Sequence, residues 1–178
     1  MDYNEYNVAI ELQPFVKCFW SLDAEAAPAI EKQRIVPDGC MEMIFHYGGL
    51  YRQYMPDGSF IIQPRCFVFG QITTPLEIAP TGISGIIAAR FHPEGFAPFA
   101  SISIGEMENK AVPLEIIFGN GAVDFKNSVL SAQTNGERIK LIEAFFINKL
   151  SLPEAADRIA RTSVEVLLSC NGQISVDE

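Results

Sequence analysis

Between residues 15 and 91 the chain alternates short apolar runs with turn sequences. The runs are rich in β-branched and aromatic residues, as strands are: FVKCFWSL, RIV, MEMIFHY, FIIQ, CFVFGQI, LEIA and GIIAARF. Pro-Asp-Gly at 37–39 and again at 56–58 supplies turn chemistry between them. Turns at intervals of about ten residues predict an antiparallel sandwich or barrel.

After Phe91 the apolar residues recur at three- and four-residue spacing, which is typical of helices. Short helices are predicted in HPEGFAPFASIS, VPLEIIFG and AVDFKNSVLSA. The strongest helix is predicted over residues 136–150, where Thr134 or Asn135 can cap its start. Its apolar stripe is formed by Ile139, Ile142, Phe146 and Leu150. Pro153 predicts the start of one more helix.

These patterns predict an α+β protein in three parts. Residues 1–105 form a β-rich part, and residues 106–170 form a helical segment. In residues 171–178, an Asn-Gly pair ends a helix and Ser175 can cap the first turn of a new one. The sequence therefore predicts that a further helical domain begins at its end.

The charge balance argues against a nucleic-acid surface in this part of the protein. The formal net charge is −9, from 22 acidic and 13 basic residues, and no cluster of Lys or Arg occurs. Affinity for nucleic acid depends on cations that displace counterions from phosphates, so we expect no DNA-binding residue in this chain. The start of the chain, MDYNEYNVAI, is not a signal peptide, and no apolar run is long enough to span a bilayer. We therefore expect a cytoplasmic protein with no membrane partner.

Motifs for metal binding and catalysis are missing from the sequence. The four cysteines are far apart without a CxxC pair, and the two histidines, His46 and His92, do not form an HxH motif. No GxSxG elbow or phosphate-binding glycine loop occurs either. We expect no metal, no cofactor and no enzymatic activity.

A few polar residues within the predicted strands are the best candidates for a binding site. Arg90 lies late in an apolar strand, where a guanidinium needs an anionic partner such as Asp38, Glu42 or a ligand. Glu42 and His46 are four residues apart and so share one strand face. The alternatives are structural, because Asp38 can bond its own turn and Arg90 can form an ion pair within the fold.

Three segments, read in order, resemble a known family: RIVPDGCMEMIF, FVFGQITTPLEI and GIIAARFHPEGFAPFASISIGEMENKAVPLEIIFG. They are similar to the N-terminal sensor domain of one branch of AraC-type (AraC/XylS family) transcriptional regulators. The resemblance covers roughly residues 34–119, and the sequence departs from the family pattern by an extra residue, Glu94.

The resemblance implies a cupin-like antiparallel β-barrel or sandwich followed by C-terminal helices, which senses an effector and self-associates. Residues 171–178 would then open a helix-turn-helix domain that binds DNA beyond this chain. The expected partners are an unknown small-molecule effector and a second copy of the chain. The candidate pocket residues are Asp38, Glu42, His46, Gln71, Arg90 and His92. Arg90 favours an anionic or carbonyl-bearing effector.

The helical stripe has two interpretations. Ile139, Ile142 and Phe146 can form an isologous dimer interface, or they can pack on the protein's own barrel. Two other functions stay open beside the sensor: a standalone cupin-like enzyme, and a dimerisation domain that binds no ligand. The sequence does not identify the effector, the operator, or whether the regulator activates or represses.

Overall fold

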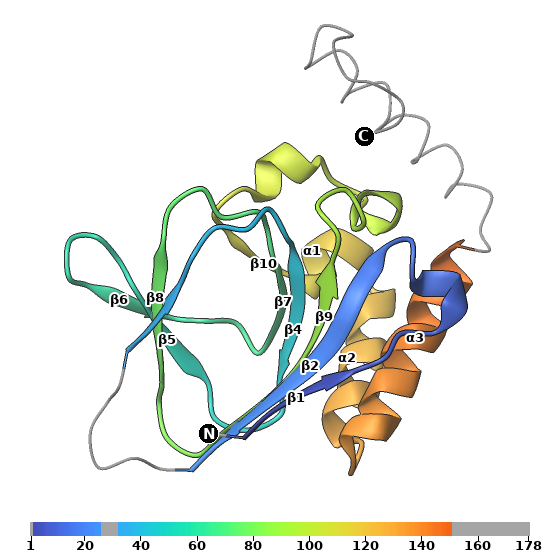
Figure 1. The fold of residues 1–178 in the computed structure, drawn as a ribbon, viewed down its shortest axis with the longest axis horizontal. Helices are drawn as coiled ribbons and strands as arrows, with labels where there is room; N and C mark the ends of the chain where they lie inside the picture. The colour runs from blue at the N-terminus through green and yellow to red at the C-terminus, as the bar shows by residue number, and fades with distance from the viewer. Residues whose placement is uncertain (1, 26–31, 151–178) are drawn as a thin grey trace, which may run out of the picture.

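The computed structural model describes residues 2–25 and 32–150, which form two antiparallel sheets and a set of helices (Figure 1). Across the larger sheet, the strands lie in the order β1 (Asp2–Tyr6), β2 (Val16–Ala24), β9 (Ser84–Phe91), β4 (Glu42–His46), β7 (Cys66–Phe69) and β10 (Ala111–Pro113). Across the smaller sheet, the order is β3 (Gln33–Ile35), β8 (Leu76–Pro80), β5 (Tyr51–Tyr54) and β6 (Phe60–Ile62).

The helices follow the sheets in the sequence and cover one side of the sandwich. They are α1 (Leu114–Phe118), α2 (Gly121–Ser131) and α3 (Asn135–Leu150), with short 3-10 turns at η1 (Ile10–Leu12), η2 (Ala97–Phe99) and η3 (Ile104–Met107). Figure 1 shows α2 and α3 against the face of the larger sheet that is turned away from the smaller one. The predicted fold class, an antiparallel sandwich followed by helices, is confirmed. The two sheets remain separate and do not close into a barrel.

Strand alternation gives the larger sheet two different faces. Successive side chains of a strand point to opposite sides, so each central strand contributes to two environments. On β4, Met43 and Phe45 belong to the core beneath the helices, whereas Ile44 packs between the sheets. On β9, Ile87 and Ala89 face the helices in the same way.

Aromatic side chains fill the core between the larger sheet and the helices. The ring of Phe146 on α3 lies 4.6 Å from that of Phe99 and 5.3 Å from that of Phe91, measured between centroids. Phe146 and Ile142 are fully buried and Ile139 is nearly so. The stripe on α3 therefore packs on the protein's own sheet, and the prediction that these three side chains form a dimer interface is wrong. The reason is that the apolar face of α3 is already needed to close the core.

Helix α3 begins with a capping box. The backbone N–H of Glu137 donates to Thr134 Oγ1 at 3.2 Å, and the Glu137 carboxylate accepts from the backbone N–H of Thr134 at 3.1 Å. Each residue thus satisfies a backbone donor that has no partner inside the helix. The predicted cap at Thr134 is confirmed.

Other boundaries differ from the sequence-based expectation. The stretch HPEGFAPFASIS forms only the single 3-10 turn η2. Just before this turn the backbone passes so close to Phe15 that only glycine fits, because a Cβ at Gly95 would lie 2.0 Å from the carbonyl oxygen of Phe15. Strands β1, β5 and β10 were not predicted, and β10 falls beyond residue 105 in the segment expected to be helical. The helix predicted from Pro153 and the helix-turn-helix opening at 171–178 lie outside the described residues.

We predict that Phe146→Ala lowers the free energy of unfolding by about 3 to 5 kcal/mol, because it leaves a cavity among well-packed rings. The measurement is urea denaturation followed by circular dichroism. Leu141→Ala, on the solvent side of the same helix, is the matched control and is expected to cost less than about 1 kcal/mol. Equal losses for the two variants would contradict the packing of α3 described above.

Candidate functional site

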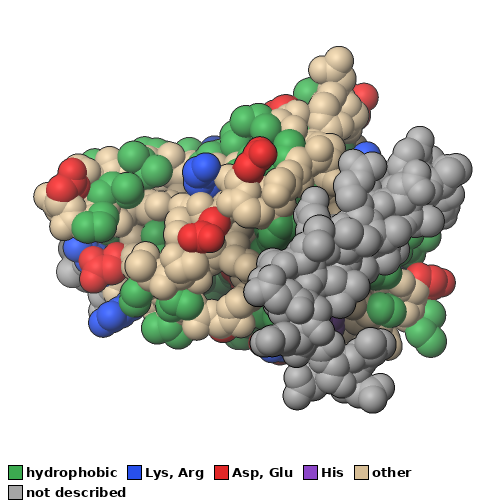
Figure 2. All heavy atoms as spheres, turned by 90° about the horizontal axis from the view of Figure 1, so that it is seen from above, with side chains coloured by type: hydrophobic (Ala, Val, Ile, Leu, Met, Phe, Trp, Pro, Cys, Tyr) green, Lys and Arg blue, Asp and Glu red, His purple; other side chains and the backbone are tan. Residues whose placement is uncertain are grey.

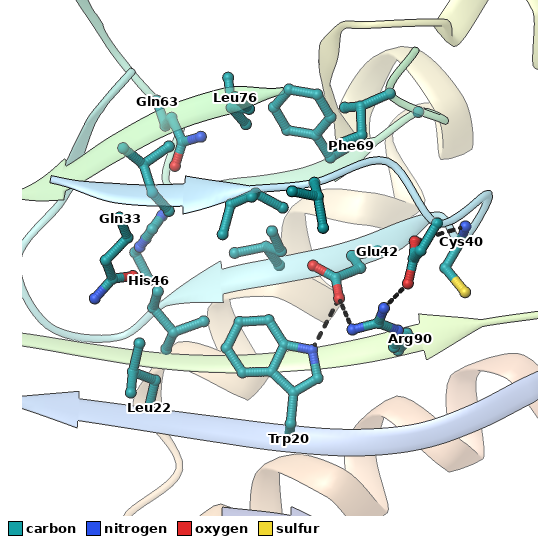
Figure 3. A pocket seen from close by; sticks show the side chains of 18 of the residues that line it. Trp20, Leu22, Gln33, Cys40, Glu42, His46, Gln63, Phe69, Leu76 and Arg90 are labelled. Atoms are coloured by element: carbon teal, nitrogen blue, oxygen red, sulfur yellow. Dashed lines mark hydrogen bonds and ion pairs between the residues drawn. The ribbon is translucent and has the colours of Figure 1, made fainter. Parts of the chain in front are cut away.

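A cavity of about 370 Å³ lies between the two sheets. Strands β2, β4, β7 and β9 supply one wall, and β3 and β8 supply the other. The wall is mostly apolar, with side chains from Leu22, Ile44, Phe69, Ile72, Leu76, Ile78 and Ile86. Figure 3 shows two polar groups of side chains separated by this apolar stretch, with Trp20, Glu42 and Arg90 at one end and Gln33, His46 and Gln63 at the other.

The first polar end is an ion cluster, and strand register explains its assembly. Glu42 on β4 is the direct antiparallel partner of Arg90 on β9. Arg90 Nη1 donates to Glu42 Oε1 at 3.4 Å, and Arg90 Nη2 forms an ion pair with Asp38 Oδ2. The indole Nε1 of Trp20 donates to the same Glu42 oxygen at 3.2 Å.

Asp38 has two roles in this cluster. Its Oδ1 accepts a hydrogen bond from the backbone N–H of Cys40 at 3.0 Å, which closes the Pro-Asp-Gly turn. Gly39 in this turn has a φ of 77°, a conformation that glycine adopts without steric cost. The other carboxylate oxygen pairs with Arg90. Both structural interpretations made from the sequence, the turn bond and the ion pair, are therefore present in residues that also line the cavity.

Glu42 is held in a largely desolvated position. Burial raises the pKa of its carboxyl to about 7, and the hydrogen bond from Trp20 acts in the opposite direction. Only 23% of the side chain is exposed, and its second oxygen, Oε2, has no hydrogen-bond partner in the described part of the chain. Near neutral pH this carboxyl therefore exists in both protonation states.

His46 forms the second polar end. Its ring is completely buried, stacks on Tyr51 with centroids 5.4 Å apart and lies 5.7 Å from the ring of Phe67. Within residues 2–25 and 32–150, neither ring nitrogen makes a hydrogen bond of good geometry, although the side-chain amide of Gln63 is close enough to interact with the ring. Buried polar atoms in proteins are nearly always paired, so this weakly satisfied imidazole is unusual.

The environment of His46 keeps its ring neutral. Burial lowers its pKa to about 4, the nearby guanidinium of Arg65 acts in the same direction, and the amide of Gln63 opposes them. A neutral imidazole has one donor and one acceptor nitrogen. His46 can therefore offer both kinds of hydrogen bond but no positive charge.

Two of the six predicted pocket residues do not line the cavity. Gln71 Nε2 donates to the carbonyl oxygens of Gly39 at 2.9 Å and Pro93 at 3.1 Å, so this side chain ties two turns together. His92 lies in the turn after β9, where its backbone N–H donates to Phe15. The prediction was wrong for both because closeness to a strand end along the sequence does not decide which way a side chain points.

Sequence reasoning also missed lining residues, chiefly Trp20, Gln33 and Gln63. Trp20 could have been found, because it alternates with the buried Phe19 and so faces the same side of the sheet as Leu22, which also lines the cavity. Gln33 and Gln63 come from the neighbourhood of the smaller sheet, and no sequence pattern places them opposite His46.

The described residues hold no group of three His, Cys, Asp or Glu side chains that could bind a metal ion. The ionisable side chains of the cavity are instead bonded to one another or separated by its apolar middle. The absence of metal and cofactor stays a prediction.

On the face seen in Figure 2, Lys and Arg side chains stand apart from one another among hydrophobic and acidic ones. This distribution agrees with the acidic balance of the chain and offers no continuous basic strip on that face. As for membranes, none of the helices in the described ranges has the length and apolar character that a crossing requires.

The opposite pKa shifts of Glu42 and His46 predict opposite effects on acid stability. Between pH 4.5 and 6.5 the folded state binds more protons at Glu42 and fewer at His46 than the unfolded chain, so the two contributions oppose each other. Relative to the wild type, Glu42→Gln should lose stability as the pH falls through this range, and His46→Phe should gain it. Each slope can reach about 1.4 kcal/mol per pH unit. Urea denaturation at several pH values gives the free energy of unfolding of each variant relative to the wild type. If this difference changes with pH in the same direction for Glu42→Gln and His46→Phe, the opposite pKa shifts are refuted.

Comparison with solved structures gives distant likenesses only. A transcriptional regulator of the HTH_3 family from Vibrio cholerae has 13% identity and a TM-score of 0.38, over 51% of this chain and 50% of that one. An RmlC-like cupin protein from Desulfovibrio desulfuricans has 14% identity and a TM-score of 0.35, over 51% of this chain and 80% of that one. The chain thus spans about half the length of the first structure, and at these TM-scores neither likeness carries an argument about function.

No curated protein matches the sequence. A family model does match, over residues 4–113, and its description is a domain of unknown function, DUF6597. Of the ten strands in the described ranges, the match includes β2 to β10 completely and residues 4–6 of β1. Since it covers more than half of the chain, the protein belongs to the DUF6597 family.

Proposed function

We propose that this chain is the small-molecule-sensing domain of a transcriptional regulator of the AraC type. The observation that carries the proposal is the cavity between the sheets, because its volume of about 370 Å³ suits a small organic molecule. An apolar wall with a few convergent polar groups is what ligand pockets in general have. The AraC resemblance over residues 34–119 largely coincides with the DUF6597 match and supplies the regulatory part of the proposal.

Binding fits this cavity better than catalysis does. The carboxyl of Glu42 and the imidazole of His46 have pKa values shifted toward neutral and acidic pH, and the two residues are four positions apart on β4, which is about 13 Å along an extended strand. At that separation they cannot act as acid and base on one reacting atom. Asp38 and Arg90 are occupied by each other. We therefore propose a receptor rather than an enzyme.

The route from ligand to regulation would pass through the larger sheet. β4 and β9 line the cavity with one face and carry α2 and α3 on the other. A ligand that binds one arrangement of sheet and helices more tightly than another shifts the population toward it. Since the α3 stripe is buried in the core, the homodimer that we expect of such a regulator needs a different surface.

Filling the cavity tests whether it is the ligand site. Ile78→Trp replaces an aliphatic side chain of β8 with an indole ring that fills part of the cavity. We expect this variant to lose the ligand-induced rise in Tm that the wild type shows with hits from a library of small organic molecules. Ile83→Trp, at a well-exposed position outside the cavity, is the control and should respond as the wild type does. Hits that shift the Tm of all three proteins equally would place binding elsewhere.

The regulatory part of the proposal is tested on the coding sequence and on DNA. We expect the reading frame after Glu178 to encode about a hundred residues rich in Lys and Arg with two helix-turn-helix patterns, and the whole protein to be cytoplasmic. A cavity ligand should then change the affinity of the full-length protein for its operator in a mobility-shift assay. A stop codon directly after Glu178 would remove the regulator and leave the ligand-binding domain.

A further inference from the structure

When Glu42 is ionised, the ion cluster at the first end of the cavity carries more negative than positive groups. Asp38 and Glu42 stand against a single guanidinium, that of Arg90. Both terminal nitrogens of Arg90 are engaged by these carboxylates, and its Nε is shut off from solvent. An anionic ligand would have to displace a carboxylate from Arg90. This arrangement argues against the anionic effector that Arg90 suggested from the sequence.

A free acceptor and an aromatic surface lie beside these carboxylates. Glu42 uses Oε1 for both Trp20 and Arg90, and no residue of the described ranges bonds its Oε2 in the cavity wall. The indole of Trp20 also lines the cavity, with the ring of Tyr3 at 6.0 Å between centroids. Glu42 lies at the N–H edge of this indole. A carboxylate beside an aromatic side chain can hold an organic cation, because the carboxylate accepts a charge-assisted hydrogen bond and the ring face attracts a cation.

We infer that the ligand of this cavity is an organic cation, with an ammonium or amidinium group on a mainly apolar body. Its charged group would bond Glu42 Oε2 beside the Trp20 ring, and its body would lie along the apolar wall formed by Ile44, Leu76 and Ile78. The inference rests on the proposed function, since it names the ligand class of the same cavity.

His46 determines the chemistry at the far end of the cavity. Its ring is fully buried beside the amide of Gln63, neither nitrogen makes a hydrogen bond of good geometry in the described part of the chain, and stacking on Tyr51 holds the ring in place. Because the imidazole is neutral, it suits an uncharged hydrogen-bonding group and adds no repulsion toward a cation. A second polar group on the ligand, if it reaches His46, is thus expected to be neutral.

The protonation of Glu42 links cation binding to pH. A bound cation favours the ionised carboxylate, whose pKa of about 7 in the free protein means that binding releases a proton below neutral pH. The charged and titratable groups around Glu42 include Arg90 on β9, Asp38 and Cys40 before β4, Cys18 on β2 and Tyr3 on β1. Burial raises the pKa of both thiols and of the Tyr3 phenol, so these three groups stay neutral in this range.

Three probes of the same shape separate charge from fit: 4-phenylbutylamine, 4-phenylbutanol and 4-phenylbutyrate. Isothermal titration calorimetry at pH 8 should give the amine the lowest Kd, at least roughly tenfold below that of the alcohol, with the carboxylate weakest. Glu42→Gln keeps the side-chain shape and should weaken the amine by roughly tenfold while the alcohol changes less than about twofold. Glu77→Gln, on the outer face of β8, is the matched control and should change nothing.

The outcomes distinguish this inference from the proposed function. Alcohol or carboxylate binding as tight as amine binding overturns the cation inference and leaves the sensor proposal standing. Failure of all three probes to bind the wild type overturns both. Amine affinity in the wild type should also rise several-fold between pH 6 and pH 8, and a rise that persists in Glu42→Gln would show that Glu42 is not the group that binds the cation.

Discussion

The two-residue period of a β-strand is the constraint on which this structure depends. β4 and β9 each send one set of side chains to the helices and the other to the cavity, so Met43 and Phe45 build the core while Glu42 and His46 border a binding space. A shift of one residue in register would exchange the two sets. The carboxylate of Glu42 would then meet the aromatic core beneath α3, and the cavity would lose its polar ends. Fold and site are thus specified by the same alternation.

The sequence predicts only those parts of the fold and of the cavity whose residues form a regular local pattern. Strands with continuous apolar runs, such as β4 and β9, were predicted, and with them the polar residues that stand at the ends of those runs: Glu42, His46 and Arg90. β1 and β5 were missed because DYNEY and YRQY carry tyrosines among polar residues and gain their apolar contacts only from neighbouring strands. Gln63 lines the cavity only because two sheets meet, and such nonlocal contacts leave no periodic signal in one chain.

Polar contacts around the Pro-Asp-Gly turn connect the cavity with the helical side. Asp38 joins the turn to Arg90, and the amide of Gln71 joins the same turn, at Gly39, to the carbonyl of Pro93. The segment after Pro93 leads directly into η2, whose Phe99 packs against α3. A ligand that changes how Arg90 is held therefore acts on a turn that is bonded to the support of α3, although the ligand itself touches no helix.

The two sides of the larger sheet also differ in how completely they are packed. Between sheet and helices the aromatic rings interlock, whereas the space between the sheets is bordered by partly buried side chains such as Trp20, Leu76 and Ile78. Substitutions on the tightly packed side are costly, whereas substitutions around the cavity mostly alter the shape and chemistry of its lining. Selection can therefore change what the cavity accepts while the scaffold persists, so descendants of one ancestral domain could acquire different chemical specificities without refolding.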